Sequence, residues 1–297
     1  MIFRDLESRW IKLKLDKNTN ILIVGLGIIG GSFAKGFAKA GIPVNAIDTD
    51  PHAIEYALEN SIIEKGSCEV SEELISQADL IIFALYPHIF KEWIKANQKL
   101  MKPKTIISDV TGVKECIVDD IQYILREDCE FIAAHPMAGC EKLGIENSNE
   151  KIFHDANYII IPTELNTHEA IDAARQIGET LGFARISSLS PHDHDEMIGF
   201  VSQLTHCIAM TLMTCNDSKD LQYYTGDSFR DLTRIARIDE TLWSELFLLN
   251  KDSLLHQMKL FTMEFSKLER MLMEADKEGI KDMMRRSTAR RKLFDKE

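Results

Sequence analysis

Three glycines in the run ILIVGLGIIGGSFAKG, residues 21–36, have the spacing Gly25-x-Gly27-x-x-Gly30 and stand between an apolar stretch and a helical one. In that context the first glycine permits a tight turn, the second lets backbone approach a diphosphate, and the third lets the helix pack on the strand. The diphosphate would lie at the positive end of the helix. We therefore predict that Gly25, Gly27, Ile28, Ile29 and Gly30 bind a dinucleotide.

Asp48 ends a second apolar stretch, about 20 residues after the glycines, where the dinucleotide-binding pattern places an acidic residue. A carboxylate there accepts hydrogen bonds from the ribose 2′-hydroxyl and repels a 2′-phosphate. No lysine or arginine follows closely, since the next residues are Thr49, Asp50, Pro51 and His52. The pattern favours NAD over NADP as cofactor, and its alternative is an exposed aspartate in a turn.

His135 follows the apolar stretch 131–134 in the sequence AAHPMAGCEKLG, where Pro136 and Gly139 predict an irregular loop. Ligands of doubly wound sheets lie beyond the carboxyl ends of the strands. A neutral imidazole can accept a hydroxyl proton while a hydride departs. We predict that His135 is the catalytic base of a hydride transfer; the alternative is a histidine that only satisfies loop hydrogen bonds.

The elements that must position these residues alternate between short β-rich stretches and helical stretches from residue 21 to 189. This order is typical of an α/β, Rossmann-type domain with a parallel sheet, here predicted over residues 1–189. The expected strands are Ile21–Val24, Val44–Ile47, Leu80–Ala84, Thr105–Ser108, Phe131–Ala134, Tyr158–Ile161 and Ala184–Ser187.

Residues 190–297 are predicted to form an all-α domain, because no proline follows Pro191 and glycine is rare. Apolar residues recur at helical spacing from Leu242 to Leu272, which predicts one long amphipathic helix. A stripe of that length exceeds what a small domain can cover. We therefore expect a homodimer formed through the helical domain, with packing inside one chain as the alternative.

Composition excludes some partners and sites. The formal net charge of −12 disfavours nucleic acid as a partner. No segment approaches the roughly 20 uncharged apolar residues of a membrane span, so no membrane is expected. The first 20 residues mix acids and bases and lack the core of a secretory signal, which predicts a cytoplasmic protein. The six cysteines have no regular spacing and predict neither zinc site nor disulfide framework.

The run His192-Asp193-His194-Asp195 could suggest a metal ligand set. Alternating residues of these types are also typical of a helix start, where acids meet the positive end of the dipole. We predict the helix start and no metal. The basic cluster at residues 285–292 is interpreted in the same way, as a solvated helix end.

Five motifs occur together along the chain: GLGIIGGSFAKG, DVTGVK at 109–114, HPMAGCEKLG at 135–144, HDHDEMIGFVSQLTH at 192–206 and FRDLTRIAR at 229–237. In this order they resemble the prephenate dehydrogenase family of tyrosine biosynthesis, over about residues 20–275. The resemblance implies NAD-dependent oxidative decarboxylation of prephenate to 4-hydroxyphenylpyruvate. Hydride leaves ring C4 and carbon dioxide leaves C1, and aromatisation drives the reaction. The chain length leaves no room for an added chorismate mutase domain.

The resemblance also implies roles for individual residues. His135 matches the family's catalytic histidine, which binds the ring hydroxyl and accepts its proton. Arg234 matches an arginine that holds a substrate carboxylate, for which a guanidinium fork is well suited. Glu141 matches an acid that pairs with this arginine and helps to gate the pocket. His206 matches a histidine near the carboxylate end of the substrate.

Two positions depart from the family pattern. Gly112 stands where the family commonly has a serine, and we predict that the neighbouring Thr111 supplies a hydroxyl to the substrate site. Gln203 stands where the family commonly has the first of two histidines.

Three alternatives stay open. Arogenate dehydrogenase uses the same scaffold. Another β-hydroxyacid-type NAD(P) dehydrogenase would commonly carry a lysine on the first long helix of the second domain, but residues 197–213 contain none. A non-enzymatic NAD-binding module would need neither His135 nor Arg234.

Overall fold

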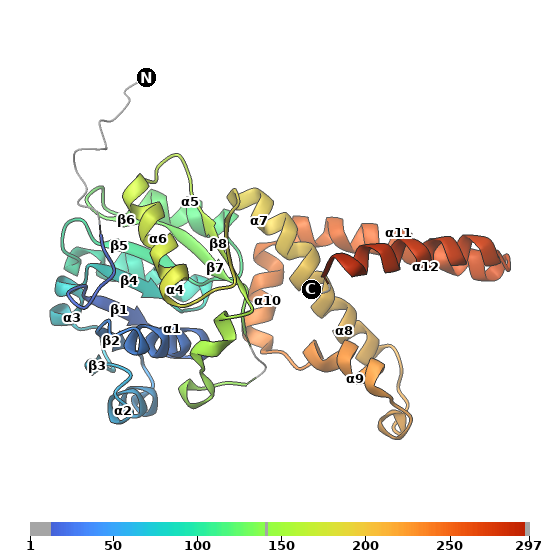
Figure 1. Ribbon diagram of the computed structural model, residues 1–297, viewed down its shortest axis with the longest axis horizontal. Helices are drawn as coiled ribbons and strands as arrows, with labels where there is room; N and C mark the ends of the chain where they lie inside the picture. Colours follow the sequence, from blue (N-terminus) through green and yellow to red (C-terminus); the bar gives the residue numbers. More distant parts are fainter. Residues whose placement is uncertain (1–12, 140–141, 295–297) are drawn as a thin grey trace.

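The computed structural model describes residues 13–139 and 142–294, and its amino-terminal half is built on a parallel sheet (Figure 1). The six strands lie in the order β3-β2-β1-β4-β5-β6. They are β1 (Ile21–Val24), β2 (Val44–Ile47), β3 (Lys65–Ser67), β4 (Leu80–Phe83), β5 (Ile106–Asp109) and β6 (Glu130–Phe131). The α/β domain with a parallel sheet is thus confirmed. Strand β3 is absent from the predicted strands because its sequence, Lys-Gly-Ser, carries no apolar signal.

Both faces of this sheet are buried, as expected where helices connect parallel strands. In β1, Ile21 and Ile23 point to one core, and Leu22 and Val24 point to the other. One core is shared with α1 (Ile28–Lys39), α2 (Pro51–Glu59) and α6 (His168–Thr180). The other is shared with α3 (Glu72–Gln77), α4 (Pro87–Asn97) and α5 (Glu115–Ile124).

A second sheet of three strands follows the first, in the order β7-β8-β9. Its strands are β7 (Ala133–Pro136), β8 (Asn157–Ile161) and β9 (Arg185–Ser188), and β7 runs antiparallel to β8. The single strand predicted over residues 131–134 is therefore wrong. The strand is interrupted at Ile132, so that β6 completes the parallel sheet and β7 begins the new one. Pro136 is compatible with β7 because β7 is an edge strand, where a missing N–H is tolerated.

Among the described residues, the carboxyl-terminal region contains helices and no strand, as predicted. It contains α7 (Pro191–Ile198), a π-helical turn at Gly199–Leu204, α8 (Thr205–Thr214), α9 (Asp227–Thr233), α10 (Glu240–Leu249), α11 (Lys251–Met273) and α12 (Lys277–Arg291). Ser190 caps the amino end of α7 by accepting the Asp193 N–H.

The single long helix predicted from Leu242 to Leu272 is wrong, because the chain breaks between α10 and α11 at Asn250. Asn250 is buried, and its amide donates to the Asp195 carbonyl at 2.9 Å and to Oε1 of Gln203 at 2.8 Å. These two bonds fix the bend. The apolar periodicity continues across it, so the pattern alone cannot reveal it.

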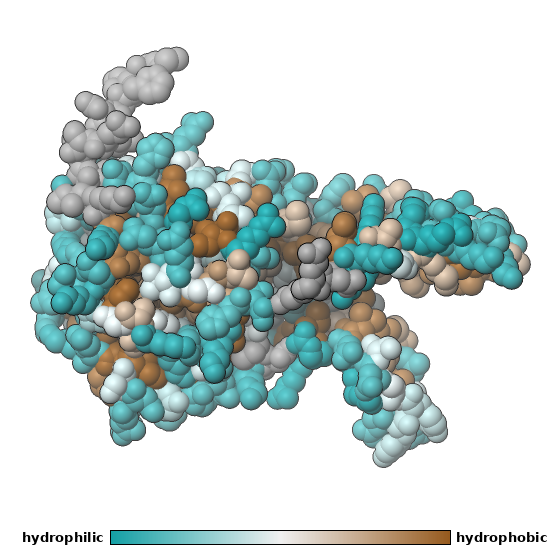
Figure 2. All heavy atoms as spheres, viewed as in Figure 1, coloured by the Kyte–Doolittle hydropathy of each residue, from teal (hydrophilic) through white to brown (hydrophobic). Residues whose placement is uncertain are grey.

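Helices α11 and α12 form an arm that projects from the rest of the chain, and α8 and α9 form a second projection (Figure 1). Apolar side chains gather at the base of α8 and along the α11–α12 arm (Figure 2). The exposed ones in α11 include Phe261, Phe265 and Leu272. A single chain therefore leaves uncovered an apolar surface of the kind that marks interfaces.

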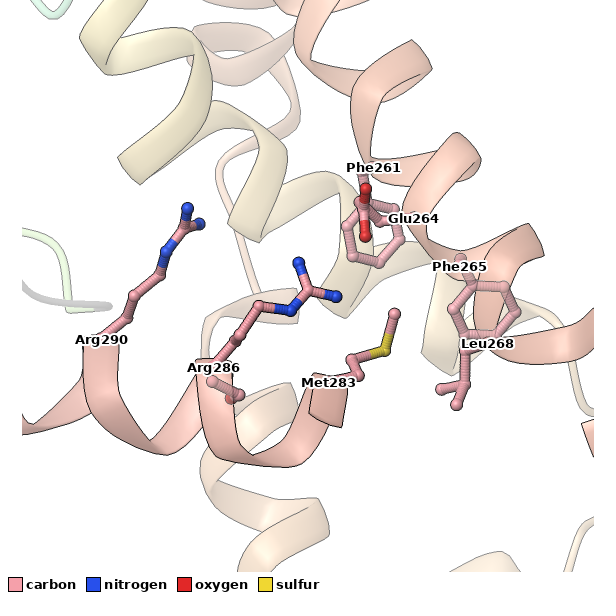
Figure 3. Close-up of a pocket in the computed structure, with 8 residues that line it drawn as sticks. Phe261, Glu264, Phe265, Leu268, Met283, Arg286 and Arg290 are labelled. Atoms are coloured by element: carbon pink, nitrogen blue, oxygen red, sulfur yellow. The ribbon is translucent and has the colours of Figure 1, made fainter. Parts of the chain in front are cut away.

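Between α11 and α12 lies a hollow of about 380 Å³ (Figure 3). Phe261, Phe265 and Met283 supply its apolar wall, and Arg286 and Arg290 lie along its α12 side. Two residues of the basic cluster thus line an apolar groove on one face of α12, which the interpretation as a solvated helix end does not anticipate. None of the predicted site residues that the structure describes lines this hollow.

The continuous helix Pro191–Thr214 is long and apolar enough to cross a membrane by length and composition alone. Because this helix carries Asp193, Asp195 and Glu196, it is not the run of roughly 20 uncharged apolar residues expected of a membrane span, and the expectation of no membrane stays a prediction. The test of length and composition is weak for this helix because its buried polar residues His194, Asp195 and Gln203 all bond to other protein groups. Such internal pairing is usual for a helix inside a folded domain.

Candidate active site

The glycine turn between β1 and α1 has little space at two of its glycines and open space at the third. Gly25 has a positive φ of 97°, and a Cβ there would lie 2.4 Å from the Ala84 carbonyl oxygen. A Cβ on Gly30 would lie 1.9 Å from the Gly25 carbonyl oxygen. A Cβ on Gly27, directly before α1, would meet nothing within 4 Å. This open cradle at a helix amino terminus fits a dinucleotide diphosphate.

The Asp48 carboxylate ties the end of β2 to the glycine turn. One oxygen accepts the Leu26 N–H at 2.5 Å, and the other accepts the Asp50 N–H at 2.8 Å. Each oxygen keeps a second lone pair, and the side chain is half-buried. Asp48 can therefore hold the turn in shape and still accept a ribose hydroxyl.

We expect Gly27→Ala and Gly30→Ala to separate nucleotide binding from folding. Gly30→Ala forces a clash with backbone and should lower the free energy of unfolding by about 1–3 kcal/mol. Gly27→Ala meets only open space, so it should keep the wild-type melting temperature and weaken NAD binding at least ~10-fold. Calorimetry and NAD titration measure the two effects. Wild-type NAD affinity in Gly27→Ala would contradict a diphosphate at this turn.

His135 lies within β7, where its strand pairs with Ile159 of β8. The predicted loop position is thus wrong, because the histidine is fixed by a strand. The strand is anchored to the end of β5, since the Ala134 N–H donates to Oδ1 of Asp109 at 3.3 Å. The imidazole itself is half-buried. A ring held in this way has one edge bound by protein and another available to a ligand.

A buried His194–Asp195 pair lies behind His135. Nδ1 of His135 is 2.9 Å from Nε2 of His194, and Nδ1 of His194 is 2.7 Å from Oδ1 of Asp195. His194 and Asp195 are 0% and 2% exposed. The Asp195 carboxylate also accepts the N–H groups of Lys114 and Glu115 at 2.8 and 2.9 Å. Asp195 therefore caps the amino end of α5 from a distant part of the chain.

Sequence reasoning missed both His194 and Asp195 as site residues, because it assigned the run 192–195 to a helix start. Asp193 does bond to the N-cap Ser190. The next two residues, however, point from the first turns of α7 into the site. One feature of the sequence could have indicated their role. His194 and Asp195 lie more than one helical turn after the N-cap Ser190, where a side chain can no longer cap its own helix.

A buried ion pair forms the floor beneath β7. Nζ of Lys114 donates to Oδ2 of Asp109 at 2.6 Å, and both side chains are fully buried. The Thr111 hydroxyl lies within hydrogen-bond distance of two acceptors, Oδ2 of Asp109 and the Val113 carbonyl, and can donate its one proton to either. The same hydroxyl accepts from Nζ of Lys114 at 3.2 Å. Thr111 is 4% exposed. The structure thus places the Thr111 hydroxyl inside this ion pair, and the contact predicted between Thr111 and the substrate remains a prediction.

Burial favours the neutral form of both histidines. The pKa of His135 lies well below its ordinary value, because burial disfavours the cation and because a positive charge on His194 or Lys114 would repel it. Burial also lowers the pKa of His194, although Asp195 opposes the shift. A neutral imidazole at ordinary cellular pH is what a proton acceptor requires.

The other predicted substrate residues come from the helical region. His206 on α8 is half-buried, and its ring lies against Trp243 of α10 with ring centres 3.7 Å apart. Nδ1 of His206 is bound to the Ser202 carbonyl at 2.9 Å, which leaves Nε2 for another partner. Arg234 begins the short 3₁₀ turn Arg234–Ala236 after α9 and is exposed. Glu141 lies outside the described residues.

The two departures from the family pattern have structural counterparts. Gln203 is 1% exposed, donates to the Leu246 carbonyl at 3.0 Å and accepts from Asn250. It therefore joins the π-helical turn before α8 to the α10–α11 bend. A side chain on Gly112 would meet Leu246, with 3.4 Å from its Cβ to the nearest methyl carbon. Leu246 thus fills the space in front of Gly112. Among the described residues no group of three acidic, histidine or cysteine side chains could hold a metal ion.

The glycine turn, the acidic end of β2 and a neutral imidazole near a parallel sheet define a dinucleotide-dependent oxidoreductase. Residues 33–187 match the nucleotide-binding domain of prephenate dehydrogenase, and residues 190–286 match its dimerization domain. The chain belongs to the prephenate dehydrogenase family.

Curated relatives agree with this assignment. Prephenate dehydrogenase of Bacillus subtilis is 26% identical over 267 residues, which cover 88% of this chain and 72% of the relative. Cyclohexadienyl dehydrogenase of Zymomonas mobilis is 26% identical, with 86% of this chain and 89% of the relative covered.

A solved structure agrees as well. Prephenate dehydrogenase of A. aeolicus, in complex with hydroxyphenyl propionate and NAD⁺, superimposes with a TM-score of 0.86 at 28% identity. The match covers 93% of this chain and 98% of that one. The family and the oxidoreductase class predicted from the motifs are confirmed.

Proposed function

We propose that this protein catalyses the NAD-dependent oxidative decarboxylation of prephenate to 4-hydroxyphenylpyruvate. The observation that carries the proposal is His135, a neutral and partly exposed imidazole whose far edge is held by the buried His194–Asp195 pair. NAD fits the open cradle at Gly27 and the carboxylate at Asp48, and a relative of 28% identity binds NAD⁺.

Bound NAD supplies the acceptor for the hydride that leaves ring C4. In this proposal His135 accepts the proton of the ring hydroxyl, so that the hydroxyl becomes the oxygen of a ring carbonyl as the hydride departs. Loss of carbon dioxide from C1 then leaves the electron pair of the broken bond in the ring, which becomes aromatic, and the carbonyl oxygen takes a proton back from His135 to form the phenol. Arg234 and His206 hold the carboxylate side of the substrate and thereby orient C4.

Turnover of prephenate and of arogenate, each with NAD and with NADP, tests this proposal. We expect kcat/KM to be highest for prephenate with NAD. A higher value for arogenate would overturn the substrate assignment. Arogenate is the second candidate substrate, because this scaffold also occurs in a relative named cyclohexadienyl dehydrogenase. A higher value with NADP would overturn the role of Asp48.

Arg234→Ala is expected to weaken substrate binding. Charge-assisted hydrogen bonds contribute about 1.5–3 kcal/mol, so KM for prephenate should rise roughly 10- to 100-fold while NAD affinity stays unchanged. The exposed Arg237, which follows the same 3₁₀ turn, supplies the matched control variant Arg237→Ala. Equal KM values for the two variants would count against a carboxylate contact at Arg234.

Activity is expected to persist below the ordinary pKa of histidine. The groups around His135 are His194, the Lys114–Asp109 pair and Asp195, and burial with the positive Lys114 lowers the pKa of His135. Because a lowered pKa keeps the base neutral further into acid, kcat/KM should stay constant down to pH 6.5 and fall only below it. An acid limb at or above pH 6.5, measured under conditions where the enzyme recovers full activity on return to pH 7.5, would refute this.

We further propose that residues 1–189 and 190–297 act as separate domains of a cytoplasmic homodimer. The apolar side chains exposed on α8 and α11 support an interface through the helical domain, whose family model is named for dimerization. Sedimentation at micromolar concentration tests this, and a monomer there would contradict it.

A further inference from the structure

His135, His194 and Asp195 form a row of hydrogen bonds that runs from the site into the protein. The two links are 2.9 Å between the histidines and 2.7 Å between His194 and Asp195. The outer member is half-buried and the two inner members are fully buried. The position of the proton in each of these two hydrogen bonds decides whether the exposed nitrogen of His135 can act as a base.

The direction of the inner link follows from Asp195. Its oxygens already accept two backbone N–H groups at the positive amino end of α5, a setting that favours the carboxylate anion. An ionised carboxylate only accepts hydrogen bonds. Nδ1 of His194 must therefore be the donor, and a neutral His194 then has a lone pair on Nε2.

The direction of the outer link follows from the inner one. The lone pair on Nε2 of His194 can only accept, so Nδ1 of His135 carries the proton and donates it. In a neutral His135 the remaining nitrogen, Nε2, then has the free lone pair. The row of hydrogen bonds thus makes Nε2 of His135, to which no described protein group binds, a hydrogen-bond acceptor.

We propose that His194 and Asp195 are positioning residues that hold His135 in its Nδ1–H tautomer and so expose Nε2 as the proton acceptor. This inference rests on the proposed function for the identity of the proton donor, the substrate hydroxyl. The tautomer itself is a property of the protein alone. The row also stabilises His135 after it gains the proton, because the Nδ1–H bond to His194 strengthens when its donor becomes positive.

The backbone around Asp195 supports this role. The Asn250 amide binds the Asp195 carbonyl at 2.9 Å, and the same amide binds Gln203. The bend between α10 and α11 therefore fixes the helix segment that carries both positioning residues. The lowered pKa of His194 agrees with a neutral ring, since a doubly protonated His194 would donate to His135 and reverse its tautomer.

Nitrogen NMR of the enzyme labelled with ¹⁵N-histidine tests the tautomer without substrate or turnover. At pH 7.5 we expect His135, assigned by its absence from His135→Gln, to show a protonated Nδ1 and an unprotonated Nε2. A protonated Nε2 on His135 would overturn the proposal. This outcome is independent of which substrate the enzyme takes, so it is distinguishable from a failure of the proposed function.

Asp195→Asn is expected to reverse the row. The asparagine oxygen can keep only one of the two backbone N–H groups that Asp195 accepts. Where it keeps that of Glu115, its nitrogen replaces Oδ1 and donates to Nδ1 of His194, which moves the His194 proton to Nε2 and forces His135 into its Nε2–H form. The wrong tautomer of a catalytic histidine is known to be costly, and we expect kcat to fall about 10²-fold with KM for NAD unchanged. The NMR signature of His135 should switch in the same variant. A switch without loss of kcat, or a loss without a switch, would each contradict the proposal.

Two substitutions of His194 separate its hydrogen bonds from its packing and cover the case in which Asp195→Asn fails to fold. In glutamine one carbon joins the amide nitrogen, which donates, to the carbonyl oxygen, which accepts. In histidine one ring carbon joins the two nitrogens in the same way. The glutamine can therefore donate to Asp195 and accept from His135. We expect kcat within ~10-fold of wild type in His194→Gln and a loss of at least ~10²-fold in the apolar His194→Leu. Similar kcat values in the two variants would overturn the positioning role.

Discussion

The variant His135→Asn is expected to lose about 10²–10⁴-fold in kcat for prephenate, the range that general base catalysis contributes. The asparagine amide has no nitrogen lone pair that could accept the proton of the substrate hydroxyl. The glycine turn and Asp48 lie on β1 and β2, whereas His135 lies on β7. We therefore expect the dissociation constant for NAD to stay within a factor of two.

His192→Asn is the matched control for this variant. His192 belongs to the same sequence region as His194, but its side chain is 64% exposed. Its replacement should leave kcat unchanged. A wild-type kcat in His135→Asn would remove the base from the proposed mechanism, and a lost affinity for NAD would show that His135 serves the cofactor site.

The cofactor half of the site could be predicted because its signals are local. The glycine spacing, the flanking strand and Asp48 all lie within one βαβ unit. Within that unit Gly25 needs its positive φ, and Gly30 packs against the Gly25 carbonyl. Strands β1, β2, β4 and β5 were equally readable, because burial on both faces makes them apolar runs, whereas the short edge strands β3 and β6 were not.

The interior of the substrate half could not be predicted from pattern, because its contacts join distant segments. Asp195 caps a helix 80 residues earlier in the chain, and the bend at Asn250 depends on two partners near residue 200. Neither partner alters the apolar periodicity of its own helix. The same is true of Lys114, which looks like an ordinary surface lysine in the sequence and is fully buried in the structure.

Lys114→Met should be the most destabilising substitution at the site. It leaves the Asp109 carboxylate buried without its cation, and removal of one partner from a buried ion pair costs about 3–5 kcal/mol. Asp109 also holds the Ala134 N–H and thereby the strand that carries His135. Urea unfolding followed by circular dichroism measures the change, and a loss below about 1 kcal/mol would contradict it.

The double variant Lys114→Met/Asp109→Asn identifies the cause of that loss. The asparagine carries no charge and still offers a carbonyl oxygen to Thr111, so we expect it to recover at least half of the stability lost in Lys114→Met. A second consequence appears in the kinetics. The positive Lys114 helps to lower the pKa of His135, so its removal should move the acid limb of kcat/KM to higher pH in both variants. An unchanged limb would show that burial alone keeps His135 neutral.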